Sequence, residues 1–357
     1  MNLRPLRNYQ TECVSNVMTA YANNLPSQMI VMGTGTGKTR TTVEIVKKFA
    51  RTLWITDSEE LIEQSAGVLA NETGQFIGII KQERMEIMHN IVVASIQTLH
   101  RRLDRIDPNL FDLIVVDECH ISCSATFMKT LNFFTPKLLI GLTATPWRTD
   151  GADLSYMFKH TAFDYPILRG INEGFLAEIN AIRVKTNINL DAINTKNGDF
   201  NERQLGSVVD IPERNKLIVE KYIEHATGRQ AMAFCVNIQH GLNLTAEFVK
   251  QGIKAEFVCS DKSICPDRKE RIKRYEDQVI QVIVNVGILT KGVDIPETSC
   301  IIWATPTKSR TKFFQGIGRG TRLKTGPFKD LLLLDVVDVT SRHRVVNSYT
   351  EDKPLNI

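Results

Sequence analysis

Short apolar runs bounded by turn residues recur along the first half of the chain and predict buried strands. They cover residues 29–32, 52–56, 91–95, 113–116 and 138–142. Stretches with helical spacing of apolar positions, such as residues 40–50 and 58–70, separate them. Strands that alternate with helices are typical of a parallel sheet with helices on its faces, so we predict an α/β domain here.

A second alternating series predicts a second domain of the same kind. Its strand-like runs are residues 231–236, 255–259, 279–285, 299–304 and 331–336, and its helix-like stretches are residues 243–251 and 269–277. Residues 185–215, rich in Asn, Asp and Thr, read as a connection between the two. We therefore expect a first domain over residues 1–180, a connecting segment over 181–215, a second domain over 216–345 and a polar tail over 346–357. A chain of 357 residues is long enough for two domains, because single cores stop growing near ~250–300 residues.

Composition places the chain among ordinary soluble globular proteins and excludes wholesale disorder, with 43% hydrophobic and 24% charged residues. The seven cysteines contain no Cys-x-x-Cys pair, which argues against a disulfide framework or a zinc knuckle. We see no signal peptide and no run of about 18 apolar residues. These observations predict a cytoplasmic protein in a reducing bacterial or host-cell cytosol, with no membrane partner.

The formal net charge of +4 is too small to indicate an anionic partner by itself. Basic residues nevertheless outnumber acidic ones between residues 308 and 344. Such a run is either a solvated face or part of a functional motif, and the sequence does not separate these two readings.

A glycine-rich turn follows the first predicted strand and opens a helix, as a phosphate-binding loop requires. It consists of Gly33, Thr34, Gly35, Thr36, Gly37, Lys38 and Thr39. Glycines let backbone N–H groups face phosphate oxygens, Lys38 can reach the β and γ phosphates, and Thr39 can hold Mg²⁺. The strict pattern would have glycine at Met32, but the end that binds phosphate is intact.

Asp117 and Glu118 follow an apolar strand, at the end of a parallel sheet where ligands gather. We expect Asp117 to bind Mg²⁺, directly or through water, and Glu118 to orient and deprotonate an attacking water. A metal site formed by Cys119, His120 and Cys123 is the alternative, although no second ligand cluster accompanies it.

These motifs and four more resemble, in order and spacing, the superfamily 2 helicases of the DExH kind, nearest to the restriction-motor and DNA-repair branch. Arg-Asn-Tyr-Gln at residues 7–10 resembles the glutamine motif, and Thr-Ala-Thr-Pro at 143–146 resembles the third motif. Residues 290–296 resemble the fifth motif, and residues 315–322 match the sixth, Gln-x-x-Gly-Arg-x-x-Arg. The resemblance covers nearly the whole chain.

The resemblance implies two RecA-like domains, each a mainly parallel sheet flanked by helices, with ATP and Mg²⁺ between them. It implies that Arg7, Gln10, Gly292 and Asp294 contact the nucleotide. It makes Arg319 and Arg322 arginine fingers and links Gln315 to His120. It also implies that His120, Thr143 and Thr145 couple the ATP state to nucleic acid.

The resemblance further points to nucleic-acid contacts at Ser58, Gln64, Ser95, Gln97, Thr98 and Thr290. Hydroxyl and amide groups suit backbone phosphates more than base edges, which predicts sequence-independent, salt-sensitive binding. Helix capping or turn formation explains each of these residues equally well. Trp147 and Arg148 could stack on a strand or pack between domains.

We therefore expect an ATP-dependent DNA helicase or translocase acting in repair, recombination or fork processing, on single-stranded, forked or branched DNA. An RNA helicase and a motor subunit of a restriction or defence complex are the alternatives, and protein partners are unknown. A non-catalytic scaffold is disfavoured by the intact set of Lys38, Glu118 and Arg322.

Overall fold

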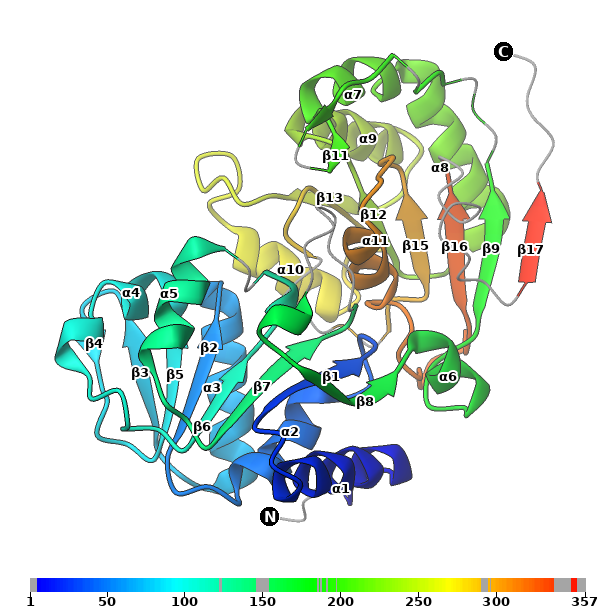
Figure 1. The fold of residues 1–357 in the computed structure, drawn as a ribbon. Coiled ribbons are helices and arrows are strands. Elements are labelled where there is room, and N and C mark those ends of the chain that lie inside the picture. Colours follow the sequence, from blue (N-terminus) through cyan, green and yellow to red (C-terminus); the bar gives the residue numbers. More distant parts are fainter. Residues whose placement is uncertain are drawn as a thin grey trace. The chain divides into compact units, whose positions relative to one another are not determined.

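The computed structural model describes residues 5–121, 124–145, 154–184, 186, 188–190, 192–196, 198–289, 295, 297–336 and 348–351. The chain divides into two compact units, Met1–Ile167 and Leu168–Ile357. Each unit is an α/β sandwich in which helices flank a single large sheet (Figure 1). The predicted fold class is confirmed.

The first unit is built on an eight-stranded sheet with the order β4-β3-β5-β2-β6-β7-β1-β8. Its strands are β1 (Ser27–Met32), β2 (Thr52–Thr56), β3 (Ile77–Lys81), β4 (Arg84–Met85), β5 (Ile91–Ser95), β6 (Leu113–Val116), β7 (Leu138–Thr143) and β8 (His160–Tyr165). Its helices are α1 (Asn8–Ala22), α2 (Lys38–Val46), α3 (Glu59–Thr73), α4 (Ile96–His100) and α5 (Ala125–Phe133). All pairings are parallel except that of β3 with β4. Helices cover both faces, so the central strands are buried along their whole length.

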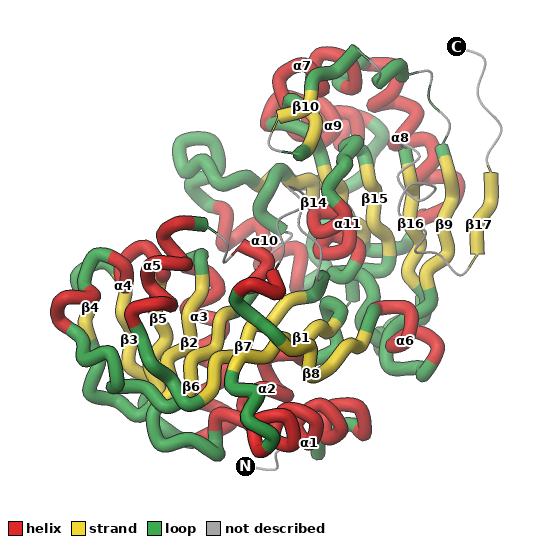
Figure 2. Tube along the Cα trace, in the orientation of Figure 1, coloured by secondary structure: helices red, strands yellow, loops and turns green. Residues whose placement is uncertain are grey.

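The second unit is built on a seven-stranded parallel sheet with the order β13-β14-β12-β15-β16-β9-β17. Figure 2 shows β15, β16, β9 and β17 side by side in this sheet. Its strands are β9 (Ile179–Arg183), β12 (Ala231–Phe234), β13 (Ala255–Val258), β14 (Val282–Asn285), β15 (Cys300–Trp303), β16 (Leu331–Asp335) and β17 (Ser348–Glu351). Its helices are α6 (Ile167–Asn172), α7 (Glu202–Val209), α8 (Pro212–Ala226), α9 (Ile238–Lys250), α10 (Arg268–Glu276) and α11 (Arg310–Ile317). A separate hairpin joins β10 (Thr195–Lys196) to β11 (Asp199–Phe200).

The observed boundaries differ from the predicted ones in three places. The second unit begins at Leu168 rather than after a connection, because β9 pairs with β16 in the second sheet. The predicted connection, residues 181–215, contains the hairpin and α7, which bury a small apolar cluster of Ile193, Phe200, Leu205, Val209 and Val236. The predicted polar tail contains β17, which pairs in parallel with β9.

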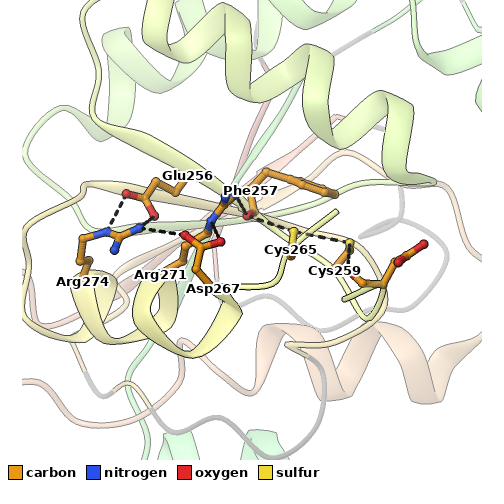
Figure 3. Close-up of polar contacts among 8 residues, drawn as sticks. Glu256, Phe257, Cys259, Cys265, Asp267, Arg271 and Arg274 are labelled. Atoms are coloured by element: carbon orange, nitrogen blue, oxygen red, sulfur yellow. Dashed lines mark hydrogen bonds and ion pairs between the residues drawn. The ribbon is translucent and has the colours of Figure 1, made fainter. Parts of the chain in front are cut away.

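Polar contacts fasten α10 to the edge strand β13 (Figure 3). Arg274 forms a two-pronged ion pair with Glu256, with distances of 2.8 Å from Nε and 2.7 Å from Nη2. Arg271 donates to the Phe257 carbonyl oxygen at 2.8 Å, and the Sγ atoms of Cys259 and Cys265 lie 3.6 Å apart. Bidentate arginine pairs fix geometry as well as adding energy, so the basic helix α10 is held in one orientation on the sheet.

Within the described ranges, no helix combines the length and the apolar character needed to cross a membrane.

Candidate active site

The glycine-rich turn links β1 to α2 in the first unit, as predicted. Gly35 and Gly37 have φ values of +84° and +83°, a backbone region that L side chains rarely adopt. A Cβ atom at Gly37 would also lie 2.6 Å from Nε2 of Gln10. Lys38 opens α2, and its Nζ donates to the Met32 carbonyl oxygen at 3.0 Å. The turn thus presents a helix N-terminus and a lysine together, which is an anion-binding arrangement.

Helix α1 is tied to this turn through Tyr9 and Gln10. The Tyr9 hydroxyl donates to the Thr36 carbonyl oxygen at 2.7 Å, and Gln10 Nε2 donates to the same oxygen at 3.1 Å. The Arg7 backbone N–H donates to Gln10 Oε1 at 3.0 Å. Tyr9 also stacks on Tyr165, with ring centroids 4.1 Å apart. Each end of the Gln10 amide can form one further hydrogen bond, so these contacts leave it capacity for a ligand.

Asp57 follows β2, and Asp117 and Glu118 follow β6, at the carboxyl ends of two paired parallel strands. Asp117 is buried, and its backbone N–H donates to the Ile55 carbonyl oxygen at 2.9 Å. Burial raises the pKa of Asp117 to about 7; the negative charges of Glu118 and Asp57 add to this effect, and Lys38 opposes it. These effects disfavour the ionised form of Asp117. A bound cation would stabilise that form.

Glu118 occupies a left-handed conformation, with φ of +50°. A non-glycine residue in this region costs on the order of 1–3 kcal/mol and persists only where the surroundings enforce it. The backbone N–H of Glu118 donates to Asp117 Oδ1 at 3.0 Å, which helps to hold the turn. The two acidic residues therefore share one sharp turn directly after β6.

His120 connects this turn to the end of β7. Its Nδ1 atom lies 3.2 Å from Glu118 Oε2 and 3.4 Å from Thr143 Oγ1. The Thr143 hydroxyl also donates to the Thr145 carbonyl oxygen at 2.6 Å and accepts from the Thr145 N–H at 3.1 Å. Residues predicted to act in coupling thus form one chain of polar contacts that ends at Glu118.

These residues fit a magnesium nucleotide. Mg²⁺ in phosphoryl-transfer sites usually takes one or two carboxylates together with substrate phosphates, and Asp117 lies near Lys38 and the turn that would hold the phosphates. Thr39, beside Lys38 in the first turn of α2, offers a hydroxyl. In the part of the chain that the structure describes, no cluster of three or more His, Cys, Asp or Glu side chains could hold a metal ion. Cys123, a member of the alternative metal site, lies outside that part.

In the second unit, the sequence Gln-Gly-Ile-Gly-Arg-Gly-Thr-Arg ends α11 and forms the loop after it. Side chains at Gly316 and Gly320 would collide with Trp303 and Leu331, so packing requires both glycines. Gln315 is buried, and its Nε2 has no hydrogen-bond partner among the described residues. Arg319 and Arg322 are both partly buried.

Lys324 supports the loop that carries Arg322. It is buried, and its Nζ donates to the carbonyl oxygens of Gly320 at 2.6 Å and Arg322 at 3.2 Å. Burial lowers the pKa of Lys324 to about 8. Sequence reasoning missed Lys324, because nothing in a basic run distinguishes a buried lysine from exposed ones. It also missed Tyr9 and Asp57, although Asp57 follows a predicted strand in the same way as Asp117.

Comparisons with known proteins match the chain to two families. Residues 4–148 match the family described as "Type III restriction enzyme, res subunit", and residues 213–324 match "Helicase conserved C-terminal domain". The chain is a superfamily 2 helicase of the restriction-motor branch. The helicase domains imply the use of ATP.

Relatives of the helicase include ATP-dependent helicase IRC3 of Saccharomyces cerevisiae, 33% identical over 244 residues, which are 66% of this chain and 35% of IRC3. The endonuclease subunit of the Escherichia coli type I restriction enzyme EcoAI is 26% identical over 356 residues, covering 89% of this chain and 44% of the subunit. The helicase thus spans less than half the length of either relative. Among solved structures, a fragment described as an HsdR subunit of a type I restriction enzyme from Vibrio vulnificus has a TM-score of 0.78 at 22% identity, covering 97% of this chain and 68% of that one.

The candidate nucleic-acid residues of the first unit gather after β2 and β5, whose ends pair at Thr56 and Ser95. Ser58 caps α3, accepting from the Leu61 N–H at 3.3 Å. Ser95 donates to Gln97 at 2.7 Å, and Gln97 Nε2 donates to the Asp57 carbonyl oxygen at 3.3 Å. Thr98 Oγ1 accepts from the Gln82 N–H at 3.1 Å, and Gln64 is exposed on α3. Ser58, Ser95, Gln97 and Thr98 therefore have structural roles at the ends of these β-strands. That they contact nucleic acid remains a proposal.

Trp147, Arg148, Thr290, Gly292 and Asp294 lie outside the described residues.

Proposed function

We propose that this helicase couples ATP hydrolysis to movement along DNA or to its unwinding. The observation that carries the proposal is the assembly of Lys38, Asp117 and Glu118 at one edge of one sheet, with a polar link through His120 to Thr143. A hydrolytic site needs a phosphate grip, a cation ligand and a base within reach of one another, and these three residues supply them.

Each residue has a distinct role in the proposed reaction. Lys38 and the N–H groups of residues 33–39 bind the phosphates, while Asp117 and Thr39 hold Mg²⁺, which when bound neutralises charge on the phosphate oxygens. Glu118 orients a water and accepts its proton. Arg319 and Arg322 of the second unit approach the γ-phosphate when the units close, with Gln315 beside them. Arg7, Gln10, Gly292 and Asp294 complete the nucleotide contacts.

DNA is the proposed substrate because the motif wording is nearest the DNA branch and the named relatives include restriction-enzyme subunits. Repair, recombination or fork processing in the cytosol is the proposed setting. Ser58, Gln64, Ser95, Gln97, Thr98, Trp147, Arg148 and Thr290 are the proposed strand contacts. A motor subunit of a restriction complex is the second candidate, favoured by the match to 44% of the EcoAI subunit.

Steady-state ATPase rates with single-stranded, duplex, forked and four-way DNA and with matched RNA test the proposal. We expect DNA to stimulate turnover more than RNA of the same structure, and Lys38→Ala to abolish turnover on every substrate. Greater stimulation by RNA would indicate an RNA helicase, and no stimulation by any polymer would indicate a scaffold. Displacement of a protein block from intact duplex would favour the restriction motor.

A further inference from the structure

A cavity of about 620 Å³ opens in the second unit between the β10–β11 hairpin, the start of α7 and the loop after β15. Val236 and Thr305, which line it, follow the adjacent parallel strands β12 and β15. Ligands of parallel sheets gather beyond the carboxyl ends of the strands, and α7 lies at that end of this sheet (Figure 1). None of the residues assigned above to nucleotide binding or to nucleic-acid contacts lines this cavity.

The walls of the cavity are fixed by polar contacts. The Asp199 carboxylate accepts from the Thr307 hydroxyl at 2.7 Å and from the Lys308 backbone N–H at 2.8 Å. The Lys308 ammonium donates to the Thr195 hydroxyl at 2.5 Å and lies 4.7 Å from the ring centroid of Phe200. Phe200 in turn packs into the small apolar cluster beneath the hairpin. A ligand would therefore meet a preformed surface, which lowers the entropic cost of binding.

The charge at the cavity favours an anion. Lys196 and Arg203 are exposed and Lys312 is partly exposed, and all three line it. Of the two acidic residues there, Asp199 already accepts three hydrogen bonds within the protein, from the Thr307 hydroxyl and from the backbone N–H groups of Lys308 and Phe200. Glu202 lies in the first turn of α7, where the helix dipole offsets its charge. The three cations come from three different elements, so they are spread around the opening.

We propose that this cavity binds the sugar-phosphate backbone of a nucleic-acid strand and is a strand contact of the second unit. Cations spread over the hairpin, α7 and α11 match the repeated charges of a polymer, whereas the compact charge of a free nucleotide fits the turn at residues 33–39. The inference rests on the proposed function, because the strand is the polymer along which the helicase would move.

Equilibrium binding of fluorescent single-stranded DNA and RNA of about twenty nucleotides, measured across a salt series, tests the proposal. Each phosphate contact contributes roughly 0.7 to the slope of log affinity against log salt for single strands, so Lys196→Ala/Arg203→Ala should lower the slope by about 1.4. We expect the affinity to fall about tenfold at ~0.1 M salt. The charge-preserving variant Lys196→Arg/Arg203→Lys should bind as the wild type does.

Arg169→Ala/Lys250→Ala is the matched control. It removes the same charge from partly exposed Arg169 on α6 and exposed Lys250 on α9 of the same unit, both outside the cavity, and should leave affinity and slope nearly unchanged. Wild-type affinity and slope in Lys196→Ala/Arg203→Ala would overturn the proposed site. An equal loss of affinity and slope in the control variant would overturn it too. If the wild-type chain bound neither the DNA nor the RNA, the proposed function would be overturned as well. Failure of the cavity site and failure of the proposed function are therefore distinguishable.

Discussion

At the residue scale, His120 joins the proposed base to the end of β7, since its Nδ1 atom lies within 3.4 Å of both Glu118 and Thr143. His120→Ala should break this link and lower nucleic-acid stimulation of ATPase turnover by roughly tenfold, within the range typical of coupling between sites. Thr143→Val should act in the same way. Because both changes remove one chain of contacts, the double variant should lose little more than either single variant. Additive losses in stimulated rate would contradict the link.

We expect Lys324 to position Arg322, because its Nζ donates to the carbonyl oxygens of Gly320 and Arg322. Lys324→Met should reduce kcat about tenfold or more with little change in KM for ATP, since arginine fingers act mainly on the transition state. Lys329→Met is the control, because exposed Lys329 also donates to carbonyl oxygens of this loop, at Lys324 and Thr325. Equal losses in both variants would assign Lys324 a merely structural role.

At the element scale, the sequence predicted elements with local signatures and missed those that depend on distant partners. β2, β5 and β6 have the predicted bounds, because continuous apolar runs between polar residues define buried parallel strands. β9 and β17 were missed, because β9 is specified by its pairing with β16 and β17 by its pairing with β9, and both pairings join segments distant in the sequence. The β10–β11 hairpin carried an Asn-Gly turn signal at residues 197–198 that went unused, and Gly198 has φ of +80°.

The same division holds for the candidate site. Lys38, Asp117 and Glu118 lie in local motifs and were predicted, and the structure places them together. Tyr9 and Lys324 contribute through hydrogen bonds to backbone carbonyl oxygens of loops, which their chemical types alone do not signal. Asp57 carried the same signal as Asp117, a position directly after a predicted strand, and that signal went unused.

The first turn of α9 makes stability depend on pH through His240. His240 is buried, and desolvation together with the Arg214 guanidinium lowers its pKa to about 3. Below the unfolded value near 6.5, the unfolded state binds a proton that the folded state refuses, so the free energy of unfolding falls with decreasing pH. The loss should reach about 1.4 kcal/mol per pH unit between roughly pH 6 and 4. Urea unfolding of His240→Gln should lack this part of the slope, and identical slopes in both proteins would refute the assignment.

At the scale of the whole molecule, the proposed reaction requires groups from two units that fold around separate sheets. Lys38 and Glu118 belong to the first unit and Arg322 to the second, so nucleotide binding and domain closure should be linked. An arginine finger contributes ~10³–10⁵ in rate, which corresponds to about 4–7 kcal/mol. The rate of ATP turnover should therefore depend on closure of the two units, whereas the affinity for ATP should depend mainly on the first unit.

This linkage is measurable with fluorophores at two exposed positions, Glu83 in the first unit and Lys250 in the second. A non-hydrolysable ATP analogue with Mg²⁺ should shift energy transfer between them in the wild type. Arg322→Ala should retain analogue affinity within a few-fold, because the phosphate grip is intact, but should lose most of the shift and essentially all turnover. Lys38→Ala should lose both affinity and shift. If Arg322→Ala turned over ATP at the wild-type rate, the two units could not share one nucleotide in the way proposed, because the second would supply no group to the transition state.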